Sequence, residues 1–214
     1  MKRLAFLVLL SATTPAMAQS DCHAGLVAGY VLGRSQHVPD GSVPLTDTFD
    51  VEGRAVGAKL GCMRARGGWR YGFAADLMDG NAKGEAQMRD PNANFFSETS
   101  IDWLGTLRAV GGYEFAAGWM PYLTGGVAVA SLQMRLCRVT PAFCTIDSQK
   151  FWGLVGGAGV QYRLSRRVSA NLEYVYFGFE DKPFSKSGTL VVGDRDVSVN
   201  PEAHVVRLGL NVHF

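Results

Sequence analysis

Cysteine and histidine are the residues of this sequence best suited to covalent and metal chemistry, and the chain contains four of each. The cysteines form no C-x-x-C pair, and no two histidines have the spacing of zinc ligands. We therefore expect neither a metal site nor a cofactor. An even number of cysteines in a chain with an export signal, described below, instead indicates disulfides formed in an oxidising compartment. The four cysteines are Cys22, Cys62, Cys137 and Cys144.

Two disulfides are predicted. Cys137 and Cys144 flank Pro141, so a bond between them closes a small loop and stabilises the fold by about 2–3 kcal/mol in the chain-entropy description. Cys22 and Cys62 are far apart in sequence, but an antiparallel hairpin that turns about residue 41 or 42 places them opposite each other, within reach of a disulfide. A one-residue bulge would turn one of these two thiols to the other face of the sheet.

A catalytic site for acyl chemistry requires a serine beside a histidine that a carboxylate orients. His204 is the best candidate, because on an extended strand it shares a face with Glu202, which is able to orient its ring. Its other neighbour on that face is Val206 rather than a serine, and Ser100 and Ser198 fall in predicted connections. We therefore expect no catalytic residue, with a lipid-modifying enzyme as the alternative.

The elements that must position these residues are eight segments in which apolar and polar residues alternate with period two, the pattern of a β-strand. The last segment is the clearest, with apolar residues from Val206 to Phe214 on one face and Arg207, Asn211 and His213 on the other. Many of the 26 glycines fall within the alternating segments, which disfavours helix. The segments are 24–34, 51–63, 69–77, 101–115, 120–133, 151–163, 168–178 and 203–214.

The connections between the segments alternate between long and short. Long ones are predicted near 35–50, 78–100, 134–150 and 179–202, and short ones near 64–68, 116–119 and 164–167. Because this asymmetry is typical of outer-membrane barrels, the predicted fold is all-β: a single eight-stranded antiparallel transmembrane β-barrel with four long outer loops and three short periplasmic turns. Both termini are then periplasmic. The polar connection around 79–100 is interpreted as a solvated loop rather than a dedicated binding site.

Three features favour a barrel with its apolar face outward over a soluble secreted barrel, the alternative, with that face inward. The polar faces mix single charges with glycines, which suits a narrow lumen. Aromatic pairs ten residues apart, such as Trp103 with Tyr113 and Trp152 with Tyr162, match the ~25 Å apolar band between two aromatic girdles. The unequal loops suit two ends that face different compartments.

Five charged residues are predicted to point into the lumen. A buried charge needs a partner, because an unpaired one is costly. We therefore predict a lumenal ion network of Arg108, Glu173 and Arg207, with Lys59 and Asp76 also inward. Since eight strands leave an interior just wide enough for side chains, this network is expected to plug the lumen. The alternative is a narrow water-lined channel in which these charges tune selectivity.

Residues 1–18 have the features of a cleaved secretory signal, with a basic start, an apolar run and an Ala16-Met17-Ala18 cleavage site. Residues 19–214 then form one barrel domain. Without the signal the chain carries 19 basic and 19 acidic residues. This balance argues against nucleic acid as a partner.

A family resemblance is carried by five stretches of the chain, residues 103–113 (WLGTLRAVGGY), 120–128 (MPYLTGGVA), 151–162 (FWGLVGGAGVQY), 169–176 (SANLEYVY) and 204–214 (HVVRLGLNVHF). They resemble strands of the small outer-membrane β-barrel family often labelled opacity-type or "porin family" proteins. The resemblance implies an integral protein of the Gram-negative outer membrane with a structural or surface-interaction role and no catalysis. It also implies that Phe214 is the C-terminal signal read by the barrel-assembly machinery. The expected partners are that machinery, outer-membrane lipid and lipopolysaccharide, and the chain is expected to be monomeric.

Overall fold

The computed structural model describes residues 20–35, 37–39, 49–87, 95–115, 118–138, 143–180, 182–183, 197–199 and 202–214. The predicted signal sequence, residues 1–18, lies outside the described residues. No helix in the described part of the chain is long and apolar enough to span a membrane.

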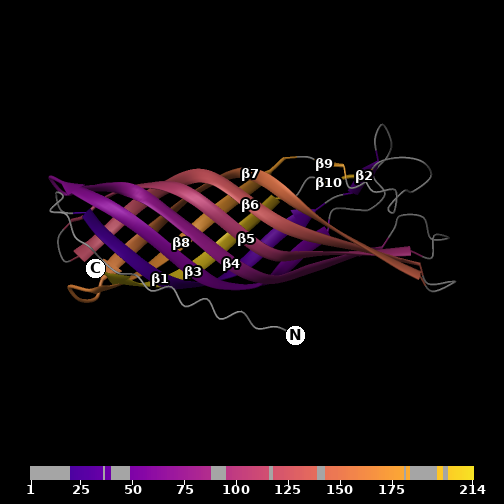
Figure 1. Ribbon diagram of the computed structural model, residues 1–214, viewed down its shortest axis with the longest axis horizontal. Coiled ribbons are helices and arrows are strands. Elements are labelled where there is room, and N and C mark those ends of the chain that lie inside the picture. The colour runs from indigo at the N-terminus through magenta and orange to yellow at the C-terminus, as the bar shows by residue number, and fades with distance from the viewer. Residues whose placement is uncertain are drawn as a thin grey trace.

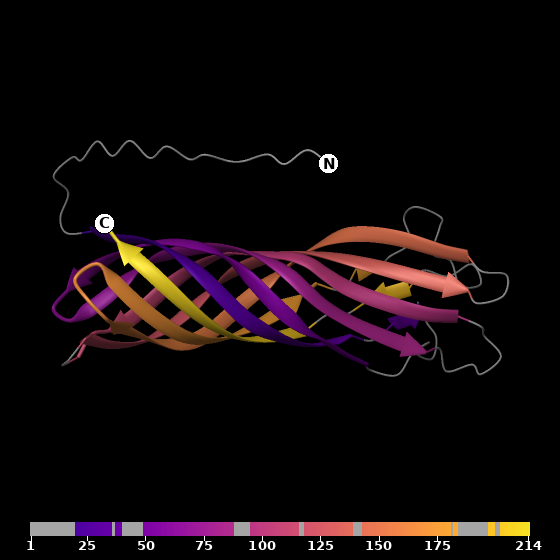
Figure 2. The same ribbon diagram turned by 90° about the horizontal axis from the view of Figure 1, so that it is seen from below.

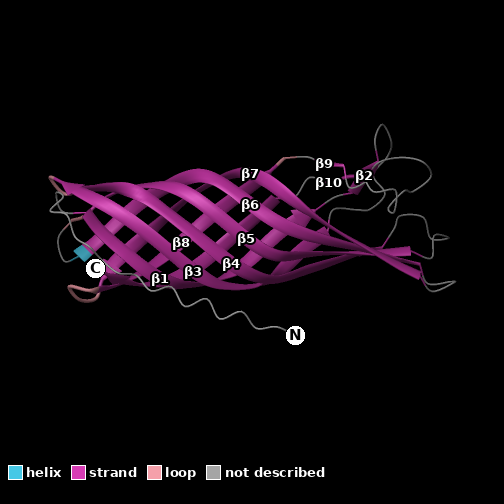
Figure 3. Ribbon diagram, viewed as in Figure 1, coloured by secondary structure: helices cyan, strands magenta, loops and turns pink. Residues whose placement is uncertain are grey.

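Eight long strands close into an antiparallel barrel (Figures 1 and 3). They are β1 (Ser20–Ser35), β3 (Phe49–Arg66), β4 (Trp69–Gln87), β5 (Phe95–Tyr113), β6 (Trp119–Arg138), β7 (Phe143–Arg163), β8 (Val168–Phe179) and β11 (Glu202–His213). Each pairs with the next of these strands along the chain, and β11 closes the barrel on β1, from the pair His23–His213 to the pair Arg34–Glu202. The predicted all-β, eight-stranded antiparallel barrel is therefore confirmed.

The two ends of the barrel differ in their connections. At one end, which we call the turn end, residues 67–68 join β3 to β4 and residues 164–167 join β7 to β8, as the sequence predicts, and Phe115 pairs with Trp119 where β5 ends and β6 begins. Gly67 and Gly68 have φ of 57° and 85°, which a two-residue hairpin turn of type I′ requires at both positions. Phe214 lies at this end, as Figure 2 shows. We call the opposite end the loop end.

At the loop end the structure differs from the predicted long loops. The pairing of β4 with β5 continues to Gln87–Phe96, and that of β6 with β7 to Arg138–Phe143. Most of the predicted connections 78–100 and 134–150 is therefore strand, and β4 to β7 project beyond the rest of the barrel (Figure 2). The sequence conceals this extension because the pairing is irregular there, and the bulge between Ile101 and Trp103 moves the inward side of β5 to the other parity, although β4 keeps its parity from Met78 to Ala82.

A small second sheet also lies at the loop end, beside the barrel (Figure 1). Its strands are β2 (His37–Pro39), β9 (Lys182–Pro183) and β10 (Val197–Val199), in the order β2-β10-β9. Both connections from which it forms were predicted as loops, because strands of two or three residues are too short to show a period.

The outward face of the barrel is an apolar band bounded by aromatic side chains. Leu26, Leu123, Leu154 and Leu208 are 63–72% exposed on this face. At the turn end Trp69 contacts Tyr113 edge to face, with ring centroids 5.3 Å apart, and other exposed aromatics at this end include Phe115, Trp119 and Tyr162. Towards the loop end the exposed aromatic residues include Tyr30, Trp152, Tyr174 and Tyr176. This is the outer surface expected of a barrel that spans a membrane.

The half of the lumen nearer the loop end is packed with apolar side chains. Along β8 the inward residues are polar as far as Glu173 and then become Val175, Phe177 and Phe179. These join a single buried cluster, which we call the apolar layer. Its bulkiest members, each at most 2% exposed, are Met78, Leu132, Phe151, Val175 and Phe177. This layer differs from the polar lumen that the sequence predicts.

Candidate functional site

Four charged side chains form a closed ring in the middle of the lumen, which we call the ion ring. Arg108 donates from its two Nη atoms to Glu173 and Asp76, at 2.7 Å in each case. Arg207 donates to the other oxygens of the same two carboxylates, from Nε to Glu173 Oε2 at 2.7 Å and from Nη1 to Asp76 Oδ1 at 3.1 Å. All four side chains are at most 3% exposed. Each carboxylate bridges both guanidinium groups. Two positive and two negative charges make the ring electrically neutral.

The strands around the ring supply further hydrogen bonds and space. Arg108 also donates from Nε to Thr106 Oγ1 at 3.0 Å. A Cβ atom at Gly29, opposite Arg207, would lie 2.8 Å from Cβ of that arginine, so only glycine leaves room for it there. The predicted residues Arg108, Glu173 and Arg207 are thus brought together with Asp76. Lys59 points inward as predicted but lies outside the ring, and its Nζ donates to Asn171 Oδ1 at 2.9 Å.

Between the ion ring and the turn end, a chain of hydrogen bonds runs along the inner wall from β1 over β11 to β8. His213 Nδ1 lies 2.6 Å from Asp21 Oδ1, and its Nε2 lies 2.8 Å from Ser169 Oγ. Asn211 donates from Nδ2 to Ser169 Oγ at 3.3 Å and to Asn171 Oδ1 at 3.1 Å. The order carboxylate, imidazole, hydroxyl is that of a serine hydrolase. However, Ser169 is 0% exposed, so no substrate carbonyl reaches its Oγ and the set is structural.

This chain is hard to predict because its members lie on three strands that are far apart in the sequence. Two features together identify it: each residue is on the inward face of its strand, and each lies near the strand end. Asp21, Ser169 and His213 are each the inward residue nearest the turn end of its strand, and β1, β11 and β8 are consecutive in the barrel.

A second set of ion pairs closes the mouth of the barrel at the turn end. Asp21 is paired with Arg70 at 3.1 Å and with Arg163 at 3.0 Å. Glu114 lies close to the same two arginines and accepts a hydrogen bond from Nε of Arg70. A cavity of about 20 Å³, lined by residues that include His23, Lys59 and Glu173, lies in the described part of the lumen and has space for about one water.

The disulfide predicted from the hairpin register is present. Cys22 and Cys62 are bonded, and they face each other across β1 and β3 in the register that the sequence analysis proposed. For the second predicted pair, the backbone register places Cys137 opposite Cys144, and Cys144 is disulfide-bonded. The side chain of Cys137 lies outside the described residues.

Three histidines, His23, His204 and His213, make ring contacts or hydrogen bonds with other side chains. Glu202 is able to orient His204 only in the enzyme alternative, and in the structure the phenol of Tyr174 contacts the ring, with its oxygen 2.6 Å from Nδ1. At the turn end the His23 ring lies 5.3 Å from that of His213. No group of three or more His, Cys, Asp or Glu among the described residues is placed to hold a metal ion. Phe214 is 72% exposed, and its backbone N–H donates to the carbonyl of Cys22.

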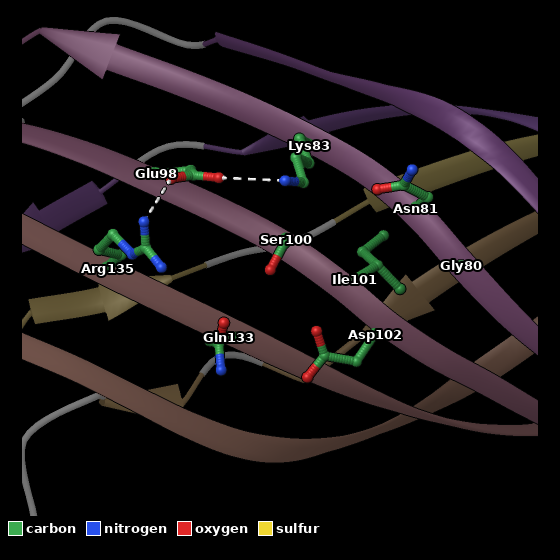
Figure 4. A pocket seen from close by; sticks show the side chains of 9 residues that line it. All are labelled: Gly80, Asn81, Lys83, Glu98, Ser100, Ile101, Asp102, Gln133 and Arg135. Atoms are coloured by element: carbon green, nitrogen blue, oxygen red, sulfur yellow. Dashed lines mark ion pairs between the residues drawn. The ribbon is translucent and has the colours of Figure 1, made fainter. Parts of the chain in front are cut away.

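A polar pocket of about 230 Å³ lies on the outer wall near the loop end (Figure 4). Its position contradicts the interpretation of 79–100 as a solvated loop, because the residues that line it belong to β4, β5 and β6. Lys83 and Arg135 both face Glu98 across it, at 3.8 Å and 3.7 Å. The lining residues are Gly80, Asn81, Lys83, Glu98, Ser100, Ile101, Asp102, Gln133 and Arg135.

Comparisons with known proteins agree with this architecture. The family model of the outer membrane protein beta-barrel domain matches residues 4–214. The 31 kDa outer-membrane immunogenic protein of Brucella melitensis is 26% identical over 203 residues, which are 90% of this chain and 82% of that protein. The crystal structure of the outer membrane protein OprG from Pseudomonas aeruginosa has a TM-score of 0.59 at 16% identity, covering 92% of this chain and 96% of that one. The outer membrane protease OmpT from Escherichia coli has a TM-score of 0.56 at 10% identity, covering 91% and 97%. At these identities the two structures share the fold alone.

Proposed function

Since this chain belongs to the outer membrane protein beta-barrel domain family, we propose that it is a monomeric, non-catalytic barrel with a closed lumen. The turn end faces the periplasm and carries both termini. The loop end faces the cell exterior, where the extended strands β4 to β7 provide a surface for interaction. Phe214, exposed at the turn end of the closing strand, is the residue that the barrel-assembly machinery reads.

The closed lumen is supported by three layers of packed side chains that follow one another along the barrel axis. The mouth at the turn end is bridged by ion pairs of Asp21 and Glu114 with two arginines. The ion ring fills the middle, with every charge compensated. Beyond it the apolar layer has no polar side chain to coordinate a passing ion. A solute would have to break ion pairs and then enter an apolar interior, and both steps are unfavourable.

The role of the loop end follows from the character of its strands. Lys83, Glu98 and Arg135 lie on strands that project past the apolar band, and their side chains carry both signs of charge. Such a surface suits contact with the polar headgroups of lipopolysaccharide and with molecules outside the cell. A lipid-modifying enzyme is disfavoured, because Tyr174 occupies Nδ1 of His204 and the buried Ser169 is inaccessible to an acyl chain.

Two experiments test the proposal. In membrane fractions, the chain is expected in the outer membrane, with a gel mobility that shifts on boiling. In planar bilayers, the purified protein is expected to give no steady conductance. A stable conductance in the nanosiemens range would refute the closed lumen, whereas recovery in the soluble periplasmic fraction without a heat shift would refute the membrane assignment.

A further inference from the structure

The polar pocket on the outer wall is produced by two bulges on adjacent strands. One shifts the register of β4 between Asp79 and Ala82, and the other shifts that of β5 between Ile101 and Trp103. Bulges bend a strand and redirect its side chains, and they are frequent beside functional sites. Here Gly80 and Asn81 on β4 have no register partner on β5, Asp102 on β5 has none on β4 or β6, and all three line the pocket.

The pocket opens away from the lumen. Ala82 and Leu132 point inward and belong to the apolar layer. Lys83 and Gln133, which follow them directly, therefore point outward. The register places these two side chains on either side of Ser100 in one row across the wall. The floor is Ile101, which packs against the apolar layer from the other side.

The polar groups that line the pocket have capacity for a ligand. Lys83 and Arg135 lie 3.7–3.8 Å from Glu98, which is too long for a hydrogen bond. Their side chains are 61% and 46% exposed, so their N–H donors are accessible from solvent. Asp102 has no ion-pair partner among the described residues. Figure 4 shows Gln133 and Asp102 below the Lys83–Glu98–Arg135 set, with Ser100 between them.

The position of the pocket indicates which molecules reach it. It begins directly on the loop-end side of Trp103 and ends at Arg135, the register partner of Glu98. Five residues of a tilted strand rise about 12 Å along the membrane normal. On the orientation proposed above, the pocket therefore lies at the level of the headgroups of the outer leaflet, facing the lipid rather than bulk solvent.

We propose that this pocket binds the anionic sugar headgroup of an outer-leaflet glycolipid, with Lys83 and Arg135 holding its phosphate and Asp102, Ser100 and Gln133 holding its hydroxyls. Guanidinium and ammonium donors are well suited to phosphate oxygens. A carboxylate and an amide accept and donate the hydrogen bonds that sugar hydroxyls need. The two carboxylates in the pocket balance the two cations, which favours a ligand with one anionic group and several hydroxyls over a polyanion.

Binding is tested with the full chain refolded in detergent, using glucosamine 1-phosphate as the soluble probe and glucosamine and inorganic phosphate as comparison probes. Saturation-transfer NMR titrations are expected to show tighter binding of glucosamine 1-phosphate than of either fragment. The variant K83Q/R135Q is expected to weaken that binding about tenfold, because hydrogen bonds between charged groups are the strongest class. D102N is expected to weaken the binding of glucosamine 1-phosphate and of glucosamine but not that of phosphate. The matched control is R54Q, which removes an exposed arginine of β3 outside the pocket.

A second arm distinguishes a lipid headgroup from a free sugar phosphate. Protein extracted gently from outer membranes is analysed by native mass spectrometry for bound lipopolysaccharide, which K83Q/R135Q is expected to lose and R54Q to retain. Binding of glucosamine 1-phosphate by a protein that retains no lipopolysaccharide would overturn the lipid assignment in favour of a free sugar phosphate. Equal binding of glucosamine 1-phosphate by all variants would show that the pocket is not the binding site. The inference rests on the proposed function only for the orientation of the barrel. Heat-modified mobility and absence of conductance in every variant would show that the proposed function stands even where the pocket fails.

Discussion

The two halves of the lumen are filled by different interactions, hydrogen bonds between polar side chains in one and apolar packing in the other. Towards the turn end the inward residues of β8 and β11 are Ser169, Asn171, Asn211 and His213, and each makes a directional hydrogen bond. Beyond the ion ring the inward residues of the same two strands are aliphatic or aromatic, and Phe177 with Phe179 stack at 6.1 Å between ring centroids. The first half depends on matched partners and the second on filled volume. The same fold therefore tolerates different substitutions at its two ends.

The largest effect is expected where a single charge is removed from the ion ring. Arg108→Met leaves two carboxylates to share Arg207, and breaking a buried ion pair in this way costs about 3–5 kcal/mol of unfolding free energy. Urea unfolding of the barrel in lipid vesicles, followed by tryptophan fluorescence, measures it. The control Arg54→Met removes an exposed arginine, and its effect is expected to stay within about 0.5 kcal/mol.

A paired substitution sharpens this result. Arg207→Met combined with Glu173→Met removes one cation with one anion and leaves Arg108 paired with Asp76. Because replacing a buried pair by apolar groups is often close to neutral, the double variant is expected to be more stable than either single variant. An equal loss of unfolding free energy in the single and double variants would show that side-chain volume rather than charge matters at the ion ring. The proposed contrast between the two halves of the lumen would then be wrong.

A smaller effect is expected from a cavity in the apolar layer. Phe177 is fully buried, and Phe177→Ala is expected to destabilise the barrel by about 3 kcal/mol through lost contacts and an unfilled volume. Phe177→Leu, which keeps most of the volume, should recover more than half of that loss in the same urea titration. If Leu were as damaging as Ala, the layer would depend on a specific aromatic contact instead of on filled volume.

The smallest effect is expected in the hydrogen-bond chain near the turn end. Ser169→Ala removes the partner of His213 Nε2 and of one Asn211 bond, and leaving these groups unpaired costs about 1–2 kcal/mol. Ser131→Ala, on the outward face of β6, is the matched control and should change little. A loss for Ser169→Ala no larger than for Ser131→Ala would mean that water substitutes for the hydroxyl and that this half is not sealed.

The turn-end half was largely predictable from the sequence, and the loop-end half was not. On β11 every second residue from Val206 to Phe214 is apolar, so the inward side of Arg207 and of its neighbours could be assigned without a structure. On β8, residues 174–177 read Tyr-Val-Tyr-Phe. Both faces are apolar there, so alternation gives no sign that Val175 and Phe177 fill the lumen.

The candidate sites show the same division. The members of the ion ring could be named because single charges on a predicted inward face need partners. The outer-wall pocket could not, because it depends on two bulges, and the one on β5 puts Ile101 on the opposite parity from the regular pattern of that strand. Register irregularities arise from pairing between strands, and a period-2 pattern read along one strand does not record them.

The Cys22–Cys62 bond also has a mechanical consequence. It links β1 to β3, while the other edge of β1 is held to β11 by hydrogen bonds across the seam that closes the barrel. A force applied at the N-terminus passes through the bond directly to residue 62, so the segment between the two cysteines, whose sequence separation is 40, bears no tension. About 140 Å of contour length is hidden in this way until the bond is reduced. Extraction from the C-terminus meets no such shortcut at β11, where strands peel away one at a time, so the protein resists pulling differently from its two ends.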